Sequence, residues 1–245
     1  MQIMLKRQLK QLSTKNNSAG FTIIESLVAV IVLGILMTAI APTIVLSTAT
    51  RVQSRRVELA TLAAGAYIDG VISGNIPAPP ISRVNEDDED VLTNDRVEAP
   101  GTSLDCDDLD DLRDKKGYCS SPDETSYKVY CVDGSGDGKC TENESKDMIV
   151  QAFGFNPQST DAAEGYKLGV RVYRADAFSD NEALEKNAGE GKATQSTFTG
   201  GLGKRKAPLV QITTDVVVPG QTTFKNWCTR LKDSNNTNSN DDCID

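Results

Sequence analysis

Six cysteines are the most reactive side chains in the sequence. A nucleophilic cysteine depends on a nearby base, usually histidine, and the sequence contains no histidine. The lack of histidine also excludes Ser-His-Asp triads and histidine-containing metal sites, and no cysteines have the Cys-x2-Cys spacing of zinc sites. We therefore expect disulfides. Fifteen pairings are possible, and joining nearest neighbours gives Cys106–Cys119, Cys131–Cys140 and Cys228–Cys243.

A second stretch that could carry chemistry is the acidic, glycine-rich segment that begins at Asp133. Its twelve residues have the spacing of an EF-hand calcium loop, with Gly138 at the sharp turn in the sixth position. Strand patterns flank the segment, so calcium here would be structural and a sensor role is not expected. The alternative is an acidic hairpin loop that binds no metal. The expected calcium ligands are Asp133, Ser135, Asp137, the carbonyl of Lys139, Thr141 through a water, and Glu144.

The other charged or glycine-rich segments do not indicate catalysis or nucleic-acid binding. The phosphate-loop pattern fails at residues 133–140, because Asp133 replaces its first glycine and Cys140 its Ser or Thr. The acidic residues of 86–90 and 105–111 predict a solvated surface, and Lys204–Lys206 predict a solvated loop. The formal charge of −9 is opposite in sign to what phosphate binding requires. We expect no enzyme activity and no nucleic-acid partner.

The N-terminal region predicts insertion into a membrane. Four basic residues and no acidic residue precede Phe21, and an apolar run of 26 residues, Phe21–Leu46, follows. About 20 residues suffice for a helix to cross a bilayer, and the basic flank places the N-terminus on the cytoplasmic side. Two alternatives are a secretory signal peptide, suggested by the pattern Ala39-Ile40-Ala41, and a plain membrane anchor.

Neither alternative explains the acidic residue Glu25 inside the apolar run. A carboxylate costs roughly 2.5–3.5 kcal/mol at the centre of a membrane helix and is usually retained for a function. If the chain is cut between Gly20 and Phe21, Glu25 becomes the fifth residue of the product, near the positive end of the helix dipole. It could then pair with the N-terminal ammonium of a neighbouring copy. Cleavage at this bond is therefore the interpretation that accounts for Glu25.

The segment Gly20–Ala29, with the sequence Gly-Phe-Thr-Ile-Ile-Glu-Ser-Leu-Val-Ala, resembles the class III signal of type IV prepilins and pseudopilins. The resemblance implies cleavage after Gly20 by prepilin peptidase, N-methylation of Phe21 and an assembly role for Glu25. Gly34 and Pro42 stand where pilin helices commonly carry a helix-loosening glycine and proline. Pro42 should kink the helix or melt it locally.

Finer resemblances indicate a branch of the family. The pattern Ile-Glu-Ser-Leu-Val-Ala is more similar to minor pilins and minor pseudopilins than to major pilins. Residues 48–60 resemble the cyanobacterial hormogonium polysaccharide secretion pseudopilins. The Cys228–Cys243 pair resembles the C-terminal disulfide loop of type IV pilins, and some pseudopilins carry a calcium ion in the head domain. The implied partners are other pilins or pseudopilins through the N-terminal helix, prepilin peptidase, the inner-membrane assembly platform and the membrane itself.

The sequence predicts an α+β fold of the type IV pilin kind. A leader peptide, 1–20, precedes an N-terminal helix, 21–74, of which 21–46 spans the membrane. An acidic linker or flap, 75–125, leads to a β-sheet head, 126–245, with disulfide-clipped loops and a C-terminal disulfide loop. Alternating or apolar runs predict an antiparallel sheet, one face of which covers the helix. The expected strands are 126–132, 148–153, 166–173, and 208–213 with 216–218.

The expected function is that of a minor pilin or pseudopilin, a structural subunit of a type IV pilus-like or type II secretion-like filament. By resemblance, the filament would serve polysaccharide secretion and surface motility. The expected location is the inner membrane, with a single span and a head that is periplasmic or on an extracellular filament. Cleavage would leave 22 Lys and Arg against 35 Asp and Glu, a charge of −13. The alternative is a single-pass, calcium-stabilised binding protein that does not polymerise.

Overall fold

The structure is a computed structural model of the chain, and its contacts define two compact units, residues 1–47 and 48–245. The expected leader before Gly20, both acidic runs and the stretch 234–242 lie outside the described residues. The described residues are 20–83, 97–102, 106, 117–119, 127–180, 182–186, 194–195, 203–218, 220–233 and 243.

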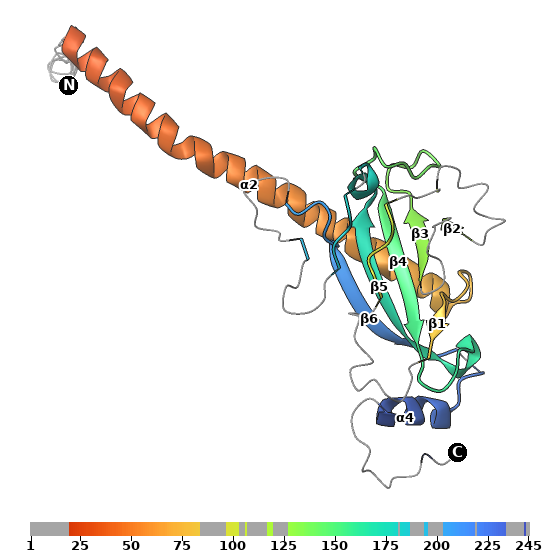
Figure 1. Cartoon of the computed structure of the whole chain (residues 1–245). Helices are drawn as coiled ribbons and strands as arrows, with labels where there is room; N and C mark the ends of the chain where they lie inside the picture. The colour runs from red at the N-terminus through yellow and green to blue at the C-terminus, as the bar shows by residue number, and fades with distance from the viewer. Residues whose placement is uncertain are drawn as a thin grey trace, which may run out of the picture. The chain divides into compact units, whose positions relative to one another are not determined.

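The longest element is helix α2, Ile23–Ile72 (Figure 1). Within the first unit its large apolar side chains are exposed, and the helix is long and apolar enough to cross a membrane. The helix continues through Pro42, so of the two outcomes that we expected there, a kink or local melting, melting is not present. Proline removes only one N–H donor from the helix, that of Pro42 itself. Thr38 and Thr43 add hydroxyl bonds, of 2.9 and 2.7 Å, to the carbonyls of Ile35 and Ile40.

The second unit contains a six-stranded sheet, and the α+β architecture that the sequence predicted is confirmed. The strands follow the order β2-β3-β4-β5-β6 with antiparallel neighbours, and the short β1 pairs in parallel with the end of β4. The strands are β1 Ile81–Ser82, β2 Tyr118–Cys119, β3 Lys128–Val132, β4 Met148–Phe155, β5 Tyr166–Arg174 and β6 Val210–Val216. The short helices are η1 Ala162–Glu164, η2 Ala175–Phe178 and α4 Phe224–Asp233.

Three of these elements differ from the sequence prediction. Strands β1 and β2 lie in the segment that we expected to be an irregular linker or flap. A strand of two residues is too short to show an alternating hydrophobic pattern. Each of the two forms only because a longer strand supplies its hydrogen-bonding partners. Helix α4 was also not expected. Its start has a local signal, since the N–H group of Asn226 donates to the hydroxyl of Thr223 over 3.2 Å, as at a helix N-cap.

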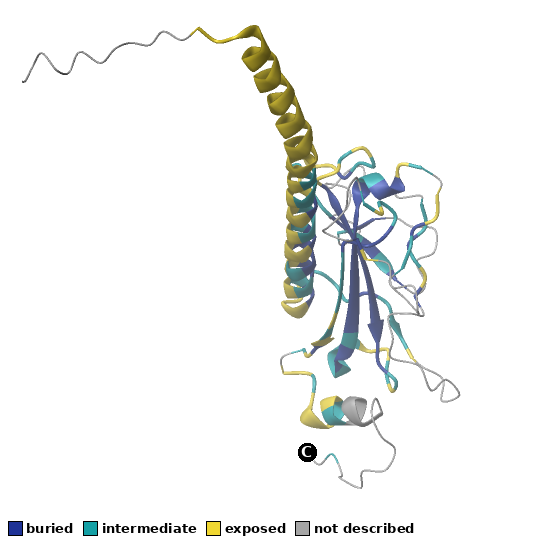
Figure 2. Ribbon diagram, turned by 90° about the vertical axis from the view of Figure 1, so that its left-hand side faces the viewer, coloured by how far each residue is buried: buried dark blue, intermediate teal, exposed yellow. Residues whose placement is uncertain are grey.

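Both faces of the sheet are covered, which creates two cores. On one side lies the helix-side core, where α2 contributes residues spaced by three and four positions and the sheet contributes alternate apolar residues (Figure 2). On the other side lies the loop-side core, which includes four cysteines and several aromatic rings. All eight residues of β4 are buried as a result. The principal helix-side residues are Ala60, Ala63, Ala64, Tyr67, Val71, Val150, Ala152, Leu168, Val170 and Val172.

A tyrosine cluster attaches the C-terminal half of α2 to the edge of the sheet. The Tyr118 hydroxyl donates to the carbonyl of Pro77 over 2.6 Å, which leaves the Tyr67 hydroxyl to donate to Tyr118 over 2.7 Å. Tyr130 packs against both rings, with its centroid 5.5 Å from that of Tyr67. Burial, more than any other cause, raises the pKa of Tyr118 to about 12, so this hydroxyl remains a donor at physiological pH.

Candidate functional site

The peptide bond between Gly20 and Phe21 precedes the first turn of α2. The helix begins at Ile23, and the N–H group of Glu25 donates both to the Thr22 hydroxyl, over 3.3 Å, and to the Thr22 carbonyl, over 3.0 Å. Thr22 therefore caps the helix. Phe21 is 78% exposed. A peptidase could reach this bond without unwinding the helix, because no helical hydrogen bond spans it.

Glu25 lies in the first turn of α2 with an exposed side chain. Its carboxylate forms no ion pair with any residue in the described part of the chain. Because the dipole of a helix favours negative charge at the N-terminal turn, the position itself stabilises an ionised acid. The arrangement leaves a negative charge next to the new N-terminus that cleavage would create.

The glycine at position 20 has no packing role among the residues that the structure describes. A Cβ atom built there meets nothing within 4 Å, and the same is true at Gly34 in the middle of the apolar run. The packing of the described residues therefore does not require a glycine at either position.

These N-terminal residues coincide with a known sequence signature. Residues 15–41 match the family model described as "Prokaryotic N-terminal methylation motif". The chain carries a prepilin methylation motif. The match supports a type IV pilin-like family, whose members are structural, and with it processing by prepilin peptidase and assembly with other pilins in a membrane. No curated protein and no solved structure matches the chain. The match ends at residue 41 and includes none of the residues 48–245 of the second unit.

The first prediction concerns processing of the methylation motif. Replacing Gly20 with valine should block cleavage and leave a chain 20 residues longer, because the peptidase would meet a branched side chain beside the scissile bond. The structure predicts no change in folding, since the site is open. Gel mobility and the mass of the membrane-extracted chain measure the result. Gly34→Ala is the matched control and should be cleaved normally; cleavage of the Gly20→Val chain at the wild-type rate would contradict the assignment.

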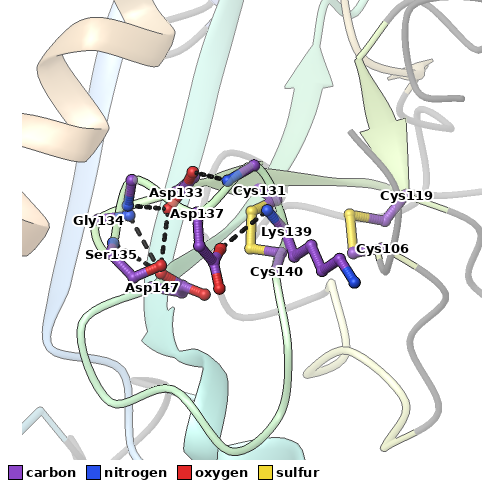
Figure 3. The surroundings of a disulfide bond; sticks show 12 residues. Cys106, Cys119, Cys131, Asp133, Gly134, Ser135, Asp137, Lys139, Cys140 and Asp147 are labelled. Carbon is purple, nitrogen blue, oxygen red and sulfur yellow. Dashed lines mark hydrogen bonds between the residues drawn. A yellow bond between two sulfur atoms is a disulfide. The ribbon is translucent and has the colours of Figure 1, made fainter. Parts of the chain in front are cut away.

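In the head, the loop that the sequence predicted to bind calcium is compact and closed by a disulfide (Figure 3). The Asp133 carboxylate accepts hydrogen bonds from the N–H groups of Gly136 and Gly138, over 2.6 and 2.8 Å, and from the Ser135 hydroxyl over 3.0 Å. Asp137 accepts from the N–H group of Lys139 over 3.0 Å. Although burial acts in the opposite direction, the backbone donors lower the pKa of Asp133.

The six expected ligands do not all converge in this structure. Asp133, Ser135 and Asp137 belong to the hydrogen-bonded loop, whereas Thr141 and Glu144 lie in the next turn, where the Glu144 N–H group donates to the Thr141 carbonyl over 3.1 Å. Among the residues that the structure describes, no three Asp, Glu, Cys or His side chains are close enough to hold a metal ion. Calcium binding by this set stays a prediction.

Three disulfides are present, and each joins cysteines that are neighbours in the sequence. Two of them, Cys106–Cys119 and Cys131–Cys140, connect loops to the sheet on the side of the loop-side core, where all four cysteines are buried (Figure 3). The third, Cys228–Cys243, joins α4 to the C-terminal tail. The disulfides are structural, because none of the six cysteines is free.

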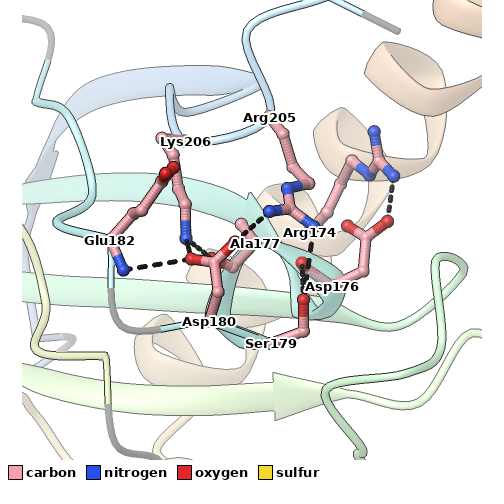
Figure 4. A network of polar contacts seen from close by, with 8 residues as sticks. All are labelled: Arg174, Asp176, Ala177, Ser179, Asp180, Glu182, Arg205 and Lys206. Carbon is pink, nitrogen blue, oxygen red and sulfur yellow. Dashed lines mark hydrogen bonds and ion pairs between the residues drawn. The ribbon is translucent and has the colours of Figure 1, made fainter.

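Of the basic residues 204–206, which the sequence predicted to form a solvated loop, Lys204 is exposed, whereas Arg205 and Lys206 are partly buried. Arg205 and Lys206 both form ion pairs with Asp180, and the Lys206 ammonium also donates to the carbonyl of Ala177 over 2.6 Å (Figure 4). Lys204 lies 3.8 Å from the carboxylate of Glu185. These contacts join the two ends of the segment 180–206. Because acidic residues close by neutralise the three cations, the patch offers little attraction to a nucleic acid.

The second prediction uses the pH dependence of this ion cluster. The hydrogen bond from Lys206 lowers the pKa of Asp180. A carboxylate with a lowered folded-state pKa stabilises the fold above its unfolded pKa, and the stability is lost as pH falls through the folded pKa. Asp180→Asn should therefore lower the melting temperature at pH 7 by a few degrees at most, since the pairs are partly exposed. The difference from wild type should shrink as pH falls below about 4, the ordinary pKa of aspartate, and should vanish once pH is below the lowered pKa of Asp180; a constant difference would contradict this role.

Sequence reasoning missed Arg171, the largest fully buried side chain. Its guanidinium donates to the Val97 carbonyl over 2.8 Å, to the Gln151 side chain over 3.1 Å and to the Gln211 side chain over 3.2 Å. It also lies over the ring of Phe153, 5.0 Å from the centroid. Arg171 thus connects three neighbouring strands to the segment 97–98.

Proposed function

We propose that the protein is a minor pilin or pseudopilin, held in the inner membrane by one span and assembled through its N-terminal helix into a filament with its head on the periplasmic or extracellular side. The observation that carries the proposal is the start of α2. Three features occur together within the matched motif. The Gly20–Phe21 bond lies before the helix and is accessible, the helix is capped and begins at Ile23, and an acid stands in its first turn. Each is needed for cleavage followed by helix-to-helix assembly.

The exposed apolar surface of the first unit supports polymerisation. Its large apolar side chains are exposed in the isolated chain. Either lipid or neighbouring helices must shield them from water. Pairing of Glu25 with the ammonium of a neighbouring Phe21 would neutralise two charges that a bilayer or filament interior rejects. The head has the α+β construction, with a helix-covered sheet and disulfide-closed loops, that suits a subunit outside the cytoplasm.

We further propose that the filament belongs to an export system of the polysaccharide-secreting, surface-motility type. Support comes from the minor-pilin pattern around Glu25 and from the likeness of residues 48–60 to the hormogonium pseudopilins. The partners under this proposal are other pilins, prepilin peptidase and an inner-membrane assembly platform. The non-polymerising, single-pass binding protein is the competing function.

Mass spectrometry of the mature N-terminus tests the proposed function. The chain is extracted from the membrane fraction of its native host and digested, and the N-terminal peptide is sequenced. A terminus at N-methylated Phe21 is the expected result. An intact Met1 would indicate a plain anchor, and a terminus at Pro42 would indicate a secretory signal peptide. Either would overturn the proposal.

A further inference from the structure

A layer of charged side chains closes the helix-side core at the end of β5. Along this strand Leu168, Val170 and Val172 belong to the core that packs on α2. Because side chains alternate along a strand, Arg174, the last residue of β5, lies in the same row. The Arg174 side chain is 4% exposed. Its positive charge therefore lies on the helix side of the sheet and is almost removed from water.

The guanidinium of Arg174 is only partly paired. Its Nη2 atom forms an ion pair with the carboxylate of Asp176, to the side of the ion pairs of Asp180 (Figure 4). Its Nε and Nη1 atoms are buried and have no hydrogen-bond partner among the described residues, and the same is true of Oδ1 of Asp176. A buried N–H group without an acceptor is costly, and a guanidinium cannot relieve the cost by losing its proton. The two nitrogen atoms indicate that an acceptor is missing.

A second guanidinium, that of Arg56, belongs to the same layer. Arg56 follows Gln53 by three residues and precedes Ala60 by four, and both of these are buried, so it lies on the face of α2 that packs on the sheet. Burial, and after it the charge of Arg174, lowers the pKa of Arg56, whereas the charge of Asp176 acts in the opposite direction. Since arginine stays protonated at physiological pH, the layer holds two positive charges and one negative charge.

The next acidic residues along the chain do not supply the missing negative charge, because they already have cationic partners. Glu58 pairs with Arg55 over 2.7 Å on the exposed side of α2. Asp180 pairs with both Arg205 and Lys206. Within the described part of the chain, the layer thus keeps an excess of one positive charge.

We propose that Arg56 and Arg174 together bind one phosphate group between α2 and the end of β5. A phosphate group brings negative charge and several acceptor oxygens. These oxygens point in different directions, so one group can accept from two guanidiniums on different elements, and arginine suits phosphate because its N–H donors form a planar fork. Arg56 is only partly buried, so the group would approach past Arg56 and accept from Arg174 on the inner side.

Two sources of phosphate share this chemistry, a phospholipid headgroup and free inorganic phosphate. Arg56 lies ten residues beyond Leu46, where the apolar run ends, a distance of about 15 Å along a helix. Residues 47–56 include Arg51 and Arg55 and no acid, and basic segments next to a membrane attract anionic lipids. The proposal does not depend on cleavage or on polymerisation of the protein.

The test is thermal unfolding of the purified full chain in detergent and phosphate-free buffer. Inorganic phosphate should raise the melting temperature by several degrees relative to sodium chloride of the same ionic strength, because an ion that binds only the folded state stabilises it. Dihexanoyl phosphatidylglycerol, added below its micelle concentration, is the second probe. Stabilisation by phosphate would support a free-phosphate source, and stabilisation by the lipid alone would support a headgroup source. No shift with either probe would overturn the proposal.

Three variants separate a bound phosphate group from a general effect of salt, with affinity for the stabilising probe measured by isothermal titration calorimetry. Arg56→Gln should weaken binding by roughly tenfold or more. Arg55→Gln is the matched control and should bind normally, because Arg55 is exposed and pairs with Glu58. Asp176→Asn should bind several-fold more tightly, since it removes the acid that competes with phosphate for the two arginines. Equal losses in Arg56→Gln and Arg55→Gln, or weaker binding by Asp176→Asn, would contradict the assignment.

Discussion

Replacing Glu25 with valine should leave the chain inserted in the membrane and cleaved after Gly20, but should exclude it from filaments. Insertion and cleavage should persist because the apolar character of the segment rises and the Gly20–Phe21 bond is unchanged. The start of the helix should persist too, since the Thr22 hydroxyl caps it without help from the carboxylate. What the variant loses is the partner for a neighbouring N-terminal ammonium, which would then be buried unpaired.

The measurement compares the membrane and sheared-filament fractions by immunoblot, together with the mass of the N-terminal peptide. We expect the valine variant in the membrane fraction at wild-type level and a decrease of at least tenfold in the filament fraction. Ser26→Val is the matched control, because the Ser26 hydroxyl only donates to the Ile23 carbonyl of its own helix over 2.8 Å. Wild-type incorporation of Glu25→Val, or failure of Ser26→Val, would show that the acid has no special part in assembly.

The second large effect is expected at Arg171, where substitution by methionine should destabilise the head by roughly 3 kcal/mol or more. A methionine side chain occupies part of the same space but cannot donate hydrogen bonds. The carbonyl of Val97 and the side chains of Gln151 and Gln211 would lose their donor inside the protein, and the contact of the guanidinium with the Phe153 ring would also be lost.

Thermal and chemical denaturation of the full chain in detergent, followed by circular dichroism, measure this loss. For a domain of this size the expected fall in melting temperature is roughly 6–12 °C. Arg205→Met is the matched control, and it should cost less than about 1 kcal/mol because its ion pair with Asp180 is partly exposed. Equal midpoints for wild type and Arg171→Met would mean that the buried network does not hold the segment 97–98 in place.

The parts of the structure that the sequence predicts are those whose signal is local. The apolar run, the acid at position 25 and the glycine before Phe21 lie within a few residues of one another, so the candidate cleavage and assembly site can be recognised before any fold is known. The long strands β3 to β6 were also predicted to within a few residues, because each carries its own alternating or apolar pattern.

The features that were missed depend on contacts between distant segments. Arg171 alternates with apolar residues along β5, a pattern typical of a solvent-facing side chain, but residues 97–98 cover it on the second face of the sheet. Asp147 accepts hydrogen bonds from the N–H groups of Gly134 and Ser135, but it lies outside the twelve-residue frame of the calcium pattern, and these contacts form only after β3 and β4 pair. Two-residue strands such as β1 have no pattern of their own and depend entirely on β4.

Because the head has two cores, its two faces differ in how readily their residues can be replaced. Alanines at 60, 63 and 64 bring α2 close to the sheet, so a larger residue in the helix-side core would push the helix away. The loop-side core is instead covered by loops, two of them closed by disulfides, and loops tolerate insertions and exchanges. Insertions and substitutions should therefore accumulate on the loop-covered face of the head among related sequences, while the helix-covered face keeps small residues at positions 60, 63 and 64.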